Sequence, residues 1–391
     1  MAGARSTVEL LRRLVAFDTV SAKPNIALIE WAAQRLEDAG FRCFVQHGDE
    51  PGKANLFATV GPDDVAGWML SGHSDVVPVT GQAWSSDPFA LREQGGRLYG
   101  RGAADMKGFL ACVLEAAPRL AAHRLRAPLH VVLSYDEETT MRGMRTLAAH
   151  LADAPLLPTA CIIGEPTSMH LVVANKGAAG YRVHVRGHSV HSSLRDRGVS
   201  AVEQAAEIIV FVGRLQRELD AAARHDGFEY PHTSVHGGRI EGGTAHNITA
   251  KDCDFVLEIR TLPGMRSAEV LERVRRHCDE VVLPAMRRIA ADTAITFEEL
   301  FDTPPLDERG NRSLAQAVAP LCGHAEARRV SFGTEAGILQ AIGIPTVVCG
   351  PGDIAVAHQP DEYVETAQLE RCSAFLDALG RRLSERGAEA L

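Results

Sequence analysis

Short apolar segments alternate with longer segments of helical periodicity in both halves of this chain, and this alternation restricts its fold more than any other feature. The apolar segments have the length of buried strands, and the longer segments repeat apolar residues every three or four positions. Strand, helix and strand in succession indicate βαβ units and a mainly parallel, covered sheet. The expected strands are 67–72, 129–134, 161–164 and 346–349, and the expected helices that precede or join them are 106–120, 141–152 and 336–341.

The middle of the chain has a different order of elements. From residue 180 onward it reads strand, long helix, two strands, helix and strand, which is the βαββαβ order of a split ferredoxin-like module. We therefore predict an α/β catalytic domain in two parts, 1–178 and 301–391, with an inserted α+β satellite domain at 179–300. The segments of that insertion are 181–187, 199–224, 233–240, 252–260, 267–288 and 294–300.

Composition excludes several classes of function. The 391 residues carry a formal net charge of −9 without a basic patch, which argues against a nucleic-acid partner. No run of about 18 apolar residues predicts a membrane span, and arginines interrupt the N-terminal segment where a signal peptide would be apolar. The eight cysteines form no Cys-x-x-Cys pair, so we expect reduced thiols in a cytoplasmic protein.

Residues of metal-binding type follow each of the four expected strands. Because the carboxyl ends of parallel strands meet at one edge of the sheet, these side chains are expected to lie close together. A further carboxylate stands in the turn GRGAADMKG, just before an expected helix. The candidate ligands are His73, Asp105, Glu137, Glu138, Glu165 and His358.

This ligand set contains two histidines and several carboxylates but no thiolate, which suits zinc, cobalt or manganese. One ion needs three or four ligands, so the surplus suggests two ions that share a bridging carboxylate. Asp75 lies two residues after His73 on a strand-like segment and therefore points the same way, where it would orient the imidazole.

Each candidate also has a purely structural interpretation. Asp105 and its neighbouring glycines can form a tight loop with a helix N-cap. The residues 136–138 can be a solvated acidic turn, and His358 can be an ordinary loop histidine. Their occurrence together at equivalent topological positions favours the metal site.

Seven motifs extend this interpretation along nearly the whole chain. In order and spacing they resemble the dinuclear zinc aminoacylase, deacylase and carboxypeptidase family. The motifs are SGHSDVVPV, YGRGAADMKGF, SYDEET, IIGEPTS, GHSVHSS, EIRTLPG and AHQPDEYV.

The resemblance implies a role for each candidate ligand. His73 and Glu165 match the ligands of one ion, Glu138 and His358 match those of the other, and Asp105 matches the bridging residue. In the same way Glu137 matches the general base, and Asp75 matches the residue that supports the first histidine. The implied cofactors are two divalent metal ions, zinc first, with cobalt or manganese as alternatives.

The resemblance also implies functional residues in the inserted domain. His191 matches a histidine that donates to the oxyanion and reaches the site from the partner subunit of a homodimer. Arg260 matches a residue that grips the substrate carboxylate, and Asn247 matches a polar residue of the same surface. The inserted domain is therefore expected to be the dimerisation domain.

The implied reaction is hydrolysis of a small-molecule N-acyl amino acid. FGTEAGILQ followed by GPGDIAVAHQPDEY favours the branch that converts N2-acetyl-L-ornithine to L-ornithine and acetate in arginine biosynthesis, although Gly333 stands where that branch commonly has cysteine. We expect Glu335 to bind the cationic end of the substrate; its alternative role is to cap the helix that follows it.

Other functions remain open at this point. Within the family they are succinyl-diaminopimelate desuccinylase, general aminoacylase and dipeptidase. From another class comes a non-catalytic metal-binding or ligand-binding relative, which the presence of Glu137 disfavours.

Overall fold

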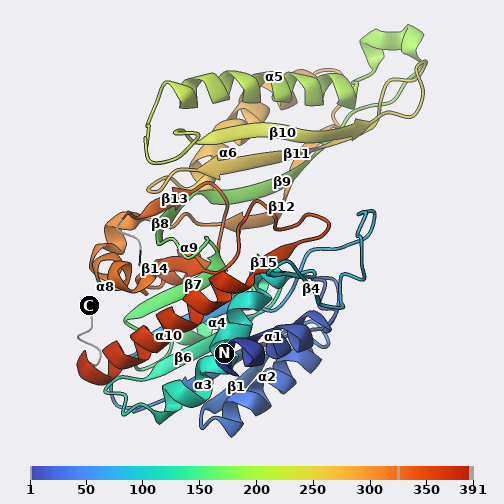
Figure 1. Cartoon of the computed structure of the whole chain (residues 1–391). Helices are drawn as coiled ribbons and strands as arrows, with labels where there is room; N and C mark the ends of the chain where they lie inside the picture. Colours follow the sequence, from blue (N-terminus) through green and yellow to red (C-terminus); the bar gives the residue numbers. More distant parts are fainter. Residues whose placement is uncertain (1, 324–325, 387–391) are drawn as a thin grey trace. The chain divides into compact units, whose positions relative to one another are not determined.

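The computed structural model describes residues 2–323 and 326–386 and contains two compact units (Figure 1). The first unit comprises Met1–Ala174, Leu306–Arg329 and Thr334–Leu391, and the second comprises Asn175–Pro305 and Val330–Gly333. Within residues 2–323 and 326–386, none of the helices combines the length and the apolar character that crossing a bilayer requires.

An eight-stranded sheet forms the centre of the first unit, in the order β1-β2-β6-β3-β7-β14-β8-β13. The four inner strands β6, β3, β7 and β14 run parallel, whereas β1 pairs antiparallel to β2, β2 to β6 and β8 to β14. The predicted α/β class with a mostly parallel central sheet is confirmed. The strands are β1 (Arg42–His47), β2 (Ala54–Val60), β3 (Trp68–His73), β6 (Leu129–Ser134), β7 (Ala160–Pro166), β8 (Val172–Asn175), β13 (Arg328–Val330) and β14 (Thr346–Gly350).

The register of the inner strands places their carboxyl ends at one edge of the sheet. His73, the last residue of β3, lies beside Ser134, the last residue of β6. On the other side, Pro166 at the end of β7 lies opposite Gly350 at the end of β14. All residues of β3, β7 and β14 are buried, so their ladders fix the backbone from which the site is built.

Seven helices are found among the described residues of the first unit (Figure 1). α1, α3 and α10 pack against one another, α2 packs on β1 and β2, and α9 packs on β14 and on α4. These helices bury the apolar faces that the sequence periodicity predicts. Their bounds are α1 (Ala2–Val15), α2 (Ile26–Asp38), α3 (Gly108–Ala122), α4 (Arg142–Ala152), α8 (Arg312–Cys322), α9 (Ala336–Ala341) and α10 (Thr366–Arg386).

A small three-stranded sheet also belongs to the first unit. Its order is β15-β5-β4, and both pairings are antiparallel. The strands are β4 (Arg92–Gln94), β5 (Arg97–Tyr99) and β15 (Tyr363–Glu365).

The helix expected from residue 106 begins later than predicted. Asp105 (φ −118°, ψ 93°) and Met106 (φ −131°, ψ 33°) have non-helical backbone within the turn Ala103–Lys107, and α3 starts at Gly108. The apolar periodicity that predicts the helix continues through this turn, which is why the sequence places the start too early. Asp105 therefore stands on an irregular turn and not at a helix N-cap.

The second unit has the predicted βαββαβ order. Its antiparallel sheet has the order β10-β11-β9-β12, and α5 and α6 pack on it (Figure 1). Alternate residues of β11 are buried, as expected of a sheet with one face against helices. The elements are β9 (Gly177–Arg186), α5 (Ala201–Asp220), β10 (Ser234–Gly242), β11 (Asp252–Thr261), α6 (Ser267–His277), α7 (Leu283–Arg287) and β12 (Ala294–Thr303).

Candidate metal centre

His73 occupies the centre of a buried cluster at the carboxyl edge of the first unit's sheet. Its side chain is 1% exposed, and its Nε2 lies 3.1 Å from Oδ1 of Asp105 and 3.8 Å from Oε1 of Glu165. Its Nδ1 lies 3.0 Å from the main-chain oxygen of Asp75 and 3.6 Å from the Asp75 carboxylate. The ring is thus oriented from behind by residue 75 and presents Nε2 to two carboxylates.

A second histidine meets the cluster from the loop after β14. Nε2 of His358 lies 2.9 Å from Oε2 of Glu138 and 3.2 Å from Oδ2 of Asp105. The two carboxylate oxygens of Asp105 therefore face different histidines. This is the arrangement that a carboxylate bridging two cations requires.

The ligand atoms lie within coordinating reach of one another. Two groups have all their ligand atoms within 4.8 Å: His73, Glu137 and Glu165 in one, and His73, Asp105 and Glu138 in the other. The geometry by itself therefore allows Glu137 to act either as a base or as a ligand.

Two buried oxygens show that the cluster fits a cation. Oε1 of Glu138 and Oε1 of Glu165 are inaccessible to water and have no hydrogen-bond partner among the described residues. Buried polar atoms are normally satisfied, and an unpartnered carboxylate oxygen is especially costly. A divalent ion held by oxygen and imidazole nitrogen would satisfy both atoms.

The electrostatics of the cluster lead to the same conclusion. Burial, reinforced by the nearby Asp105 carboxylate, raises the pKa of Glu138 to about 7 and that of Glu165 well above its usual range. Hydrogen bonds to Asp105 and Glu138 raise the pKa of His358 to about 10. The glutamates lose their protons less readily than usual, and His358 keeps its proton to a higher pH than usual. Both shifts indicate an excess of negative charge in the cluster, which a cation would neutralise.

Asp75 also fixes the turn that carries Glu137 and Glu138. Its Oδ1 accepts the N–H of Glu137 at 3.1 Å, and its Oδ2 accepts the N–H of Glu138 at 3.3 Å. The Ser21 hydroxyl donates to Oδ2 at 2.6 Å. The carboxylate thus orients the acidic turn as well as facing His73, a role that spacing along one strand does not reveal.

A buried ion pair holds the other end of this turn. Lys53 Nζ lies 2.5 Å from Oδ1 of Asp136, both side chains are almost completely buried, and the ammonium also donates to the main-chain oxygen of Ser21. Asp136 has φ 58°, a left-handed conformation that needs such support in a non-glycine residue. Sequence analysis missed Lys53 and Ser21 because neither belongs to a motif with a ligand type.

Glu335 lies at the start of α9 and is 1% exposed. It makes no side-chain cap hydrogen bond to that helix, and its Oε1 has no hydrogen-bond partner among the described residues. Burial raises its pKa to about 7, against the opposing influence of Ser134 and His73. Its carboxyl is therefore a member of the buried surroundings of Glu137 and His73, and capping does not explain its position.

The three candidates of the inserted domain lie in the second unit. His191 and Asn247 occupy neighbouring exposed loops: residues 191 and 248 form a β-bridge, and the main-chain oxygen of Asn247 accepts the N–H of Ser192 at 3.0 Å. The His191 ring lies 2.8 Å from the Ser193 hydroxyl.

Arg260 projects from β11, where Glu258 holds it. Oε1 of Glu258 accepts from Nε and Nη2 of Arg260 at 2.9 and 2.6 Å, and Oε2 lies 2.8 Å from Nε2 of His236.

Gly333 is also in the second unit, and an added Cβ there would meet only Ala178 Cβ at 3.7 Å. A Cβ would thus fit at this position, and close packing does not require a glycine.

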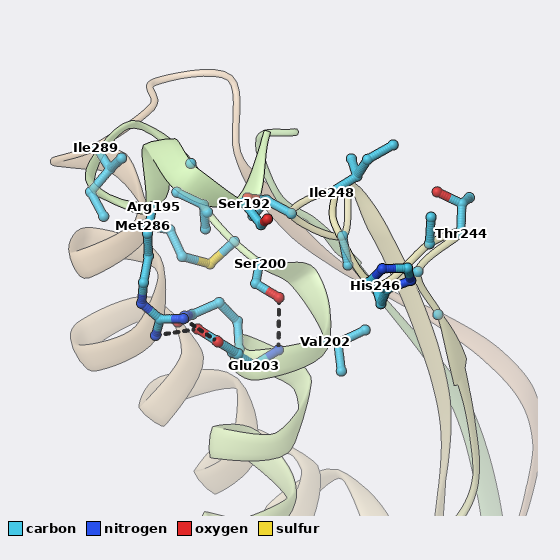
Figure 2. Close-up of a pocket in the computed structure, with 18 of the residues that line it drawn as sticks. Ser192, Arg195, Ser200, Val202, Glu203, Thr244, His246, Ile248, Met286 and Ile289 are labelled. Atoms are coloured by element: carbon cyan, nitrogen blue, oxygen red, sulfur yellow. Dashed lines mark hydrogen bonds and ion pairs between the residues drawn. The ribbon is translucent and has the colours of Figure 1, made fainter. Parts of the chain in front are cut away.

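A hollow of about 760 Å³ adjoins the loops of His191 and Asn247 within the second unit (Figure 2). The Arg195 guanidinium pairs with both carboxylate oxygens of Glu203 at 2.8 and 3.0 Å, and the Ser200 hydroxyl caps α5 by accepting the Glu203 N–H. Met286 and Ile289 supply an apolar wall. The hollow contains none of the carboxylate and histidine groups that define the metal cluster.

In comparisons with known proteins, residues 69–382 match "Peptidase family M20/M25/M40", and the chain belongs to this family. Together with the buried cluster, this membership defines a metal-dependent hydrolase of amide bonds. It is 41% identical over 381 residues to acetylornithine deacetylase of Myxococcus xanthus, covering 94% of each chain. It is 36% identical over 371 residues to acetylornithine deacetylase of Proteus mirabilis (strain HI4320), covering 93% of each.

Solved structures share the fold over nearly the whole chain. Aminopeptidase PepT from Bacillus cereus ATCC 10987 has a TM-score of 0.75 at 19% identity and covers 98% of this chain and 99% of its own. The YXEP protein of Bacillus subtilis, described as a dinuclear metal-binding peptidase of the M20 family, has a TM-score of 0.65 at 16% identity and covers 97% and 98%.

The raised pKa values predict how the metal-free protein responds to pH. Glu138, raised from 4.5 to about 7, and His358, raised from 6.5 to about 10, both bind protons more tightly in the folded state. Their contribution to stability is therefore present at low pH and is lost as pH rises through these folded values. We expect the melting temperature of the chelator-treated protein to fall between about pH 5 and 9, while the stabilisation by added zinc grows, because ligands must lose protons to bind metal.

Thermal denaturation monitored by circular dichroism at several pH values, with and without zinc, measures both trends. Glu138→Gln tests the assignment: it removes the Glu138 carboxyl and one of the two hydrogen bonds that raise the pKa of His358, so it should flatten the whole profile. A metal-free melting temperature that rises across this range would contradict the expectation.

Proposed function

We propose that this protein hydrolyses N2-acetyl-L-ornithine to L-ornithine and acetate. The observation that carries the proposal is the convergence of His73, Asp105, Glu138, Glu165 and His358 at one sheet edge with Glu137 among them. The two acetylornithine deacetylases that align over 93–94% of the chain support the substrate.

We propose two divalent ions, zinc first, as cofactors. His73 and Glu165 would hold one ion, Glu138 and His358 the other, and Asp105 would contribute one oxygen to each. The YXEP relative, described as dinuclear, supports this number. When bound, such ions activate water and polarise the scissile carbonyl group.

Glu137 would act as the general base. It accepts the proton of the water that attacks the acetyl carbon and delivers that proton to the ornithine nitrogen as the C–N bond breaks, which yields acetate and a free amine. A carboxylate oxygen of Glu137 lies within 4.8 Å of the ligand atoms of His73 and Glu165, which places the base beside the proposed point of attack.

The second unit would supply contacts to the substrate and to the developing negative charge. His191 would donate to the oxyanion from the partner subunit, and Arg260 would bind the α-carboxylate with the part of its guanidinium that Glu258 does not engage. Asn247 would contribute from the loop next to His191.

A homodimer through the second unit is part of the proposal. β10 is an edge strand of its sheet, and its residues from His236 to Gly242 are exposed, including the apolar Ile240. Exposed edge strands are ready to pair with another chain.

The eight free cysteines support a cytoplasmic location.

The central test is turnover by the zinc-loaded protein on a panel of N-acetylornithine, N-acetylmethionine, succinyl-diaminopimelate and a dipeptide. We expect preference for N-acetylornithine.

Glu137→Ala should keep its metal content and lose about 10²- to 10⁴-fold in kcat, the usual contribution of a general base. Glu50→Gln, an exposed control, should have no effect; a Glu137→Ala protein with wild-type kcat would remove this residue from the mechanism.

Glu335 is proposed to bind the substrate ammonium group. Glu335→Gln should raise KM for N-acetylornithine by about tenfold or more, as expected for the loss of a charge-assisted hydrogen bond, and should leave KM for neutral N-acetylmethionine nearly unchanged. Steady-state kinetics on the two substrates measure this difference. Equal effects on both would reject the role in specificity.

The partner-subunit role of His191 predicts complementation between two inactive proteins. His191→Ala and Glu137→Ala each lack one essential group, but a mixed dimer has one site with both. Random mixing should restore about one quarter of the wild-type activity, since half of the dimers are mixed and half of their sites complete. Mixed dimers, verified by native mass spectrometry, that stay inactive would show that His191 does not act across subunits.

A further inference from the structure

Arg101 and Glu362 form a buried ion pair in the first unit, outside the set of candidate ligands. Nη1 of Arg101 lies 2.7 Å from Oε2 of Glu362, and each side chain is 1% exposed. The residues are 261 positions apart in the chain. Arg101 follows β5 and Glu362 precedes β15, so the pair joins the turn of Asp105 to the loop of His358.

Glu362 fixes the backbone around Asp105. Its Oε1 accepts the N–H groups of Ala104 at 2.9 Å and Asp105 at 3.0 Å, and its Oε2 accepts that of Gly102 at 3.0 Å. These donors lie in an irregular turn, so without the carboxylate they would be buried and unpaired. Asp105 therefore depends on Glu362 for the position from which its two oxygens face the histidines.

Arg101 fixes the backbone around His358 in the same way. Its guanidinium donates to the main-chain oxygen of Gln359 at 3.3 Å and to the side chain of Gln82, whose amide donates to the main-chain oxygen of His358 at 2.8 Å. The indole ring of Trp84 covers the guanidinium at 5.0 Å. His358 has φ 63°, a strained conformation that these contacts hold in place.

The other half of the cluster is held by different means. His73 is the last residue of β3, and Glu165 lies within β7, so sheet ladders position both. Asp105 and His358, by contrast, stand on irregular segments. Their separation depends on the hydrogen bonds that Arg101 and Glu362 make to both segments.

We propose that Arg101 and Glu362 are positioning residues chiefly for the second cation, the one held by Glu138, His358 and Asp105. The first ion, at His73 and Glu165, has only the shared Asp105 on a segment that the pair fixes. This inference rests on the proposed dinuclear function. It assigns the pair a larger effect on one of two ions than on the other, which a general contribution to folding would not produce.

The experiment is a titration of metal-free protein with Co²⁺, followed by isothermal calorimetry and by the visible absorption of the bound ion. Wild type should bind two ions per chain. In Glu362→Gln, Nε2 cannot accept from Arg101 and Gly102, and we expect the Kd of the second ion to rise by about 10- to 100-fold, the usual effect of losing a supporting group behind a ligand. The Kd of the first ion should rise by a clearly smaller factor, because Asp105 is its only ligand on a segment that the pair fixes.

The controls come from β5 and β15, the two strands next to Arg101 and Glu362 in the sequence. Arg97 and Glu365 form an exposed pair, 3.7 Å apart, between β5 and β15. Arg97→Gln and Glu365→Gln should leave both Kd values unchanged. Arg101→Lys keeps the charge but loses the planar fork, so it should weaken the second ion more than the first and serves as the test if Glu362→Gln does not fold.

The outcomes separate the two proposals. A wild-type protein that binds a single Co²⁺ ion overturns the dinuclear function. A wild type that binds two ions, with Glu362→Gln or Arg101→Lys also binding two at unchanged affinity, overturns the positioning role alone. Equal weakening of both ions in these variants likewise overturns it, because the pair would then support only the fold.

Discussion

Repulsion between buried carboxyl groups is the constraint on which the arrangement of the first unit depends. Asp105, Glu137, Glu138 and Glu165 lie together in a water-poor region, where burial raises the pKa of the three glutamates. No arrangement of two histidines compensates this charge fully, since Oε1 of Glu138 and Oε1 of Glu165 still have no partner among the described residues. The metal-free cluster is therefore energetically unfavourable, and bound cations would relieve the repulsion between its carboxylates.

The surrounding structure withstands this repulsion by fixing backbone rather than by screening charge. Asp75 accepts the N–H groups of Glu137 and Glu138, and Glu362 accepts three from the turn that ends at Asp105. Each of these carboxylates accepts at least three hydrogen bonds, which offset part of the cost of its burial. Lys53 adds an ammonium group that pairs with Asp136 of the acidic turn. The proposed ligands are therefore held in place by groups outside the ligand set.

The sequence predicted strands correctly and indicated candidate ligands where a single local pattern determines them. Apolar runs ending in His73 and Glu165 predict both the parallel strands and the edge where the ligands meet, because strand direction and side-chain type are local properties. Ser21, Lys53 and Glu362 could not be found in this way, since their partners come from distant segments and include main-chain groups that a sequence does not display. The irregular backbone at Asp105 was missed for a similar reason: it is stabilised by Glu362, more than 250 positions away.

The spread of the ligands along the chain has a consequence for synthesis on the ribosome. His73, Asp105, Glu138 and Glu165 emerge early, but His358 and the Glu362 carboxylate that braces Asp105 emerge only after the second unit has been translated. A nascent chain therefore carries all the acidic residues of the cluster without His358 until late in elongation. The cluster cannot reach its final geometry before residues 358–362 have been synthesised, close to the end of the chain.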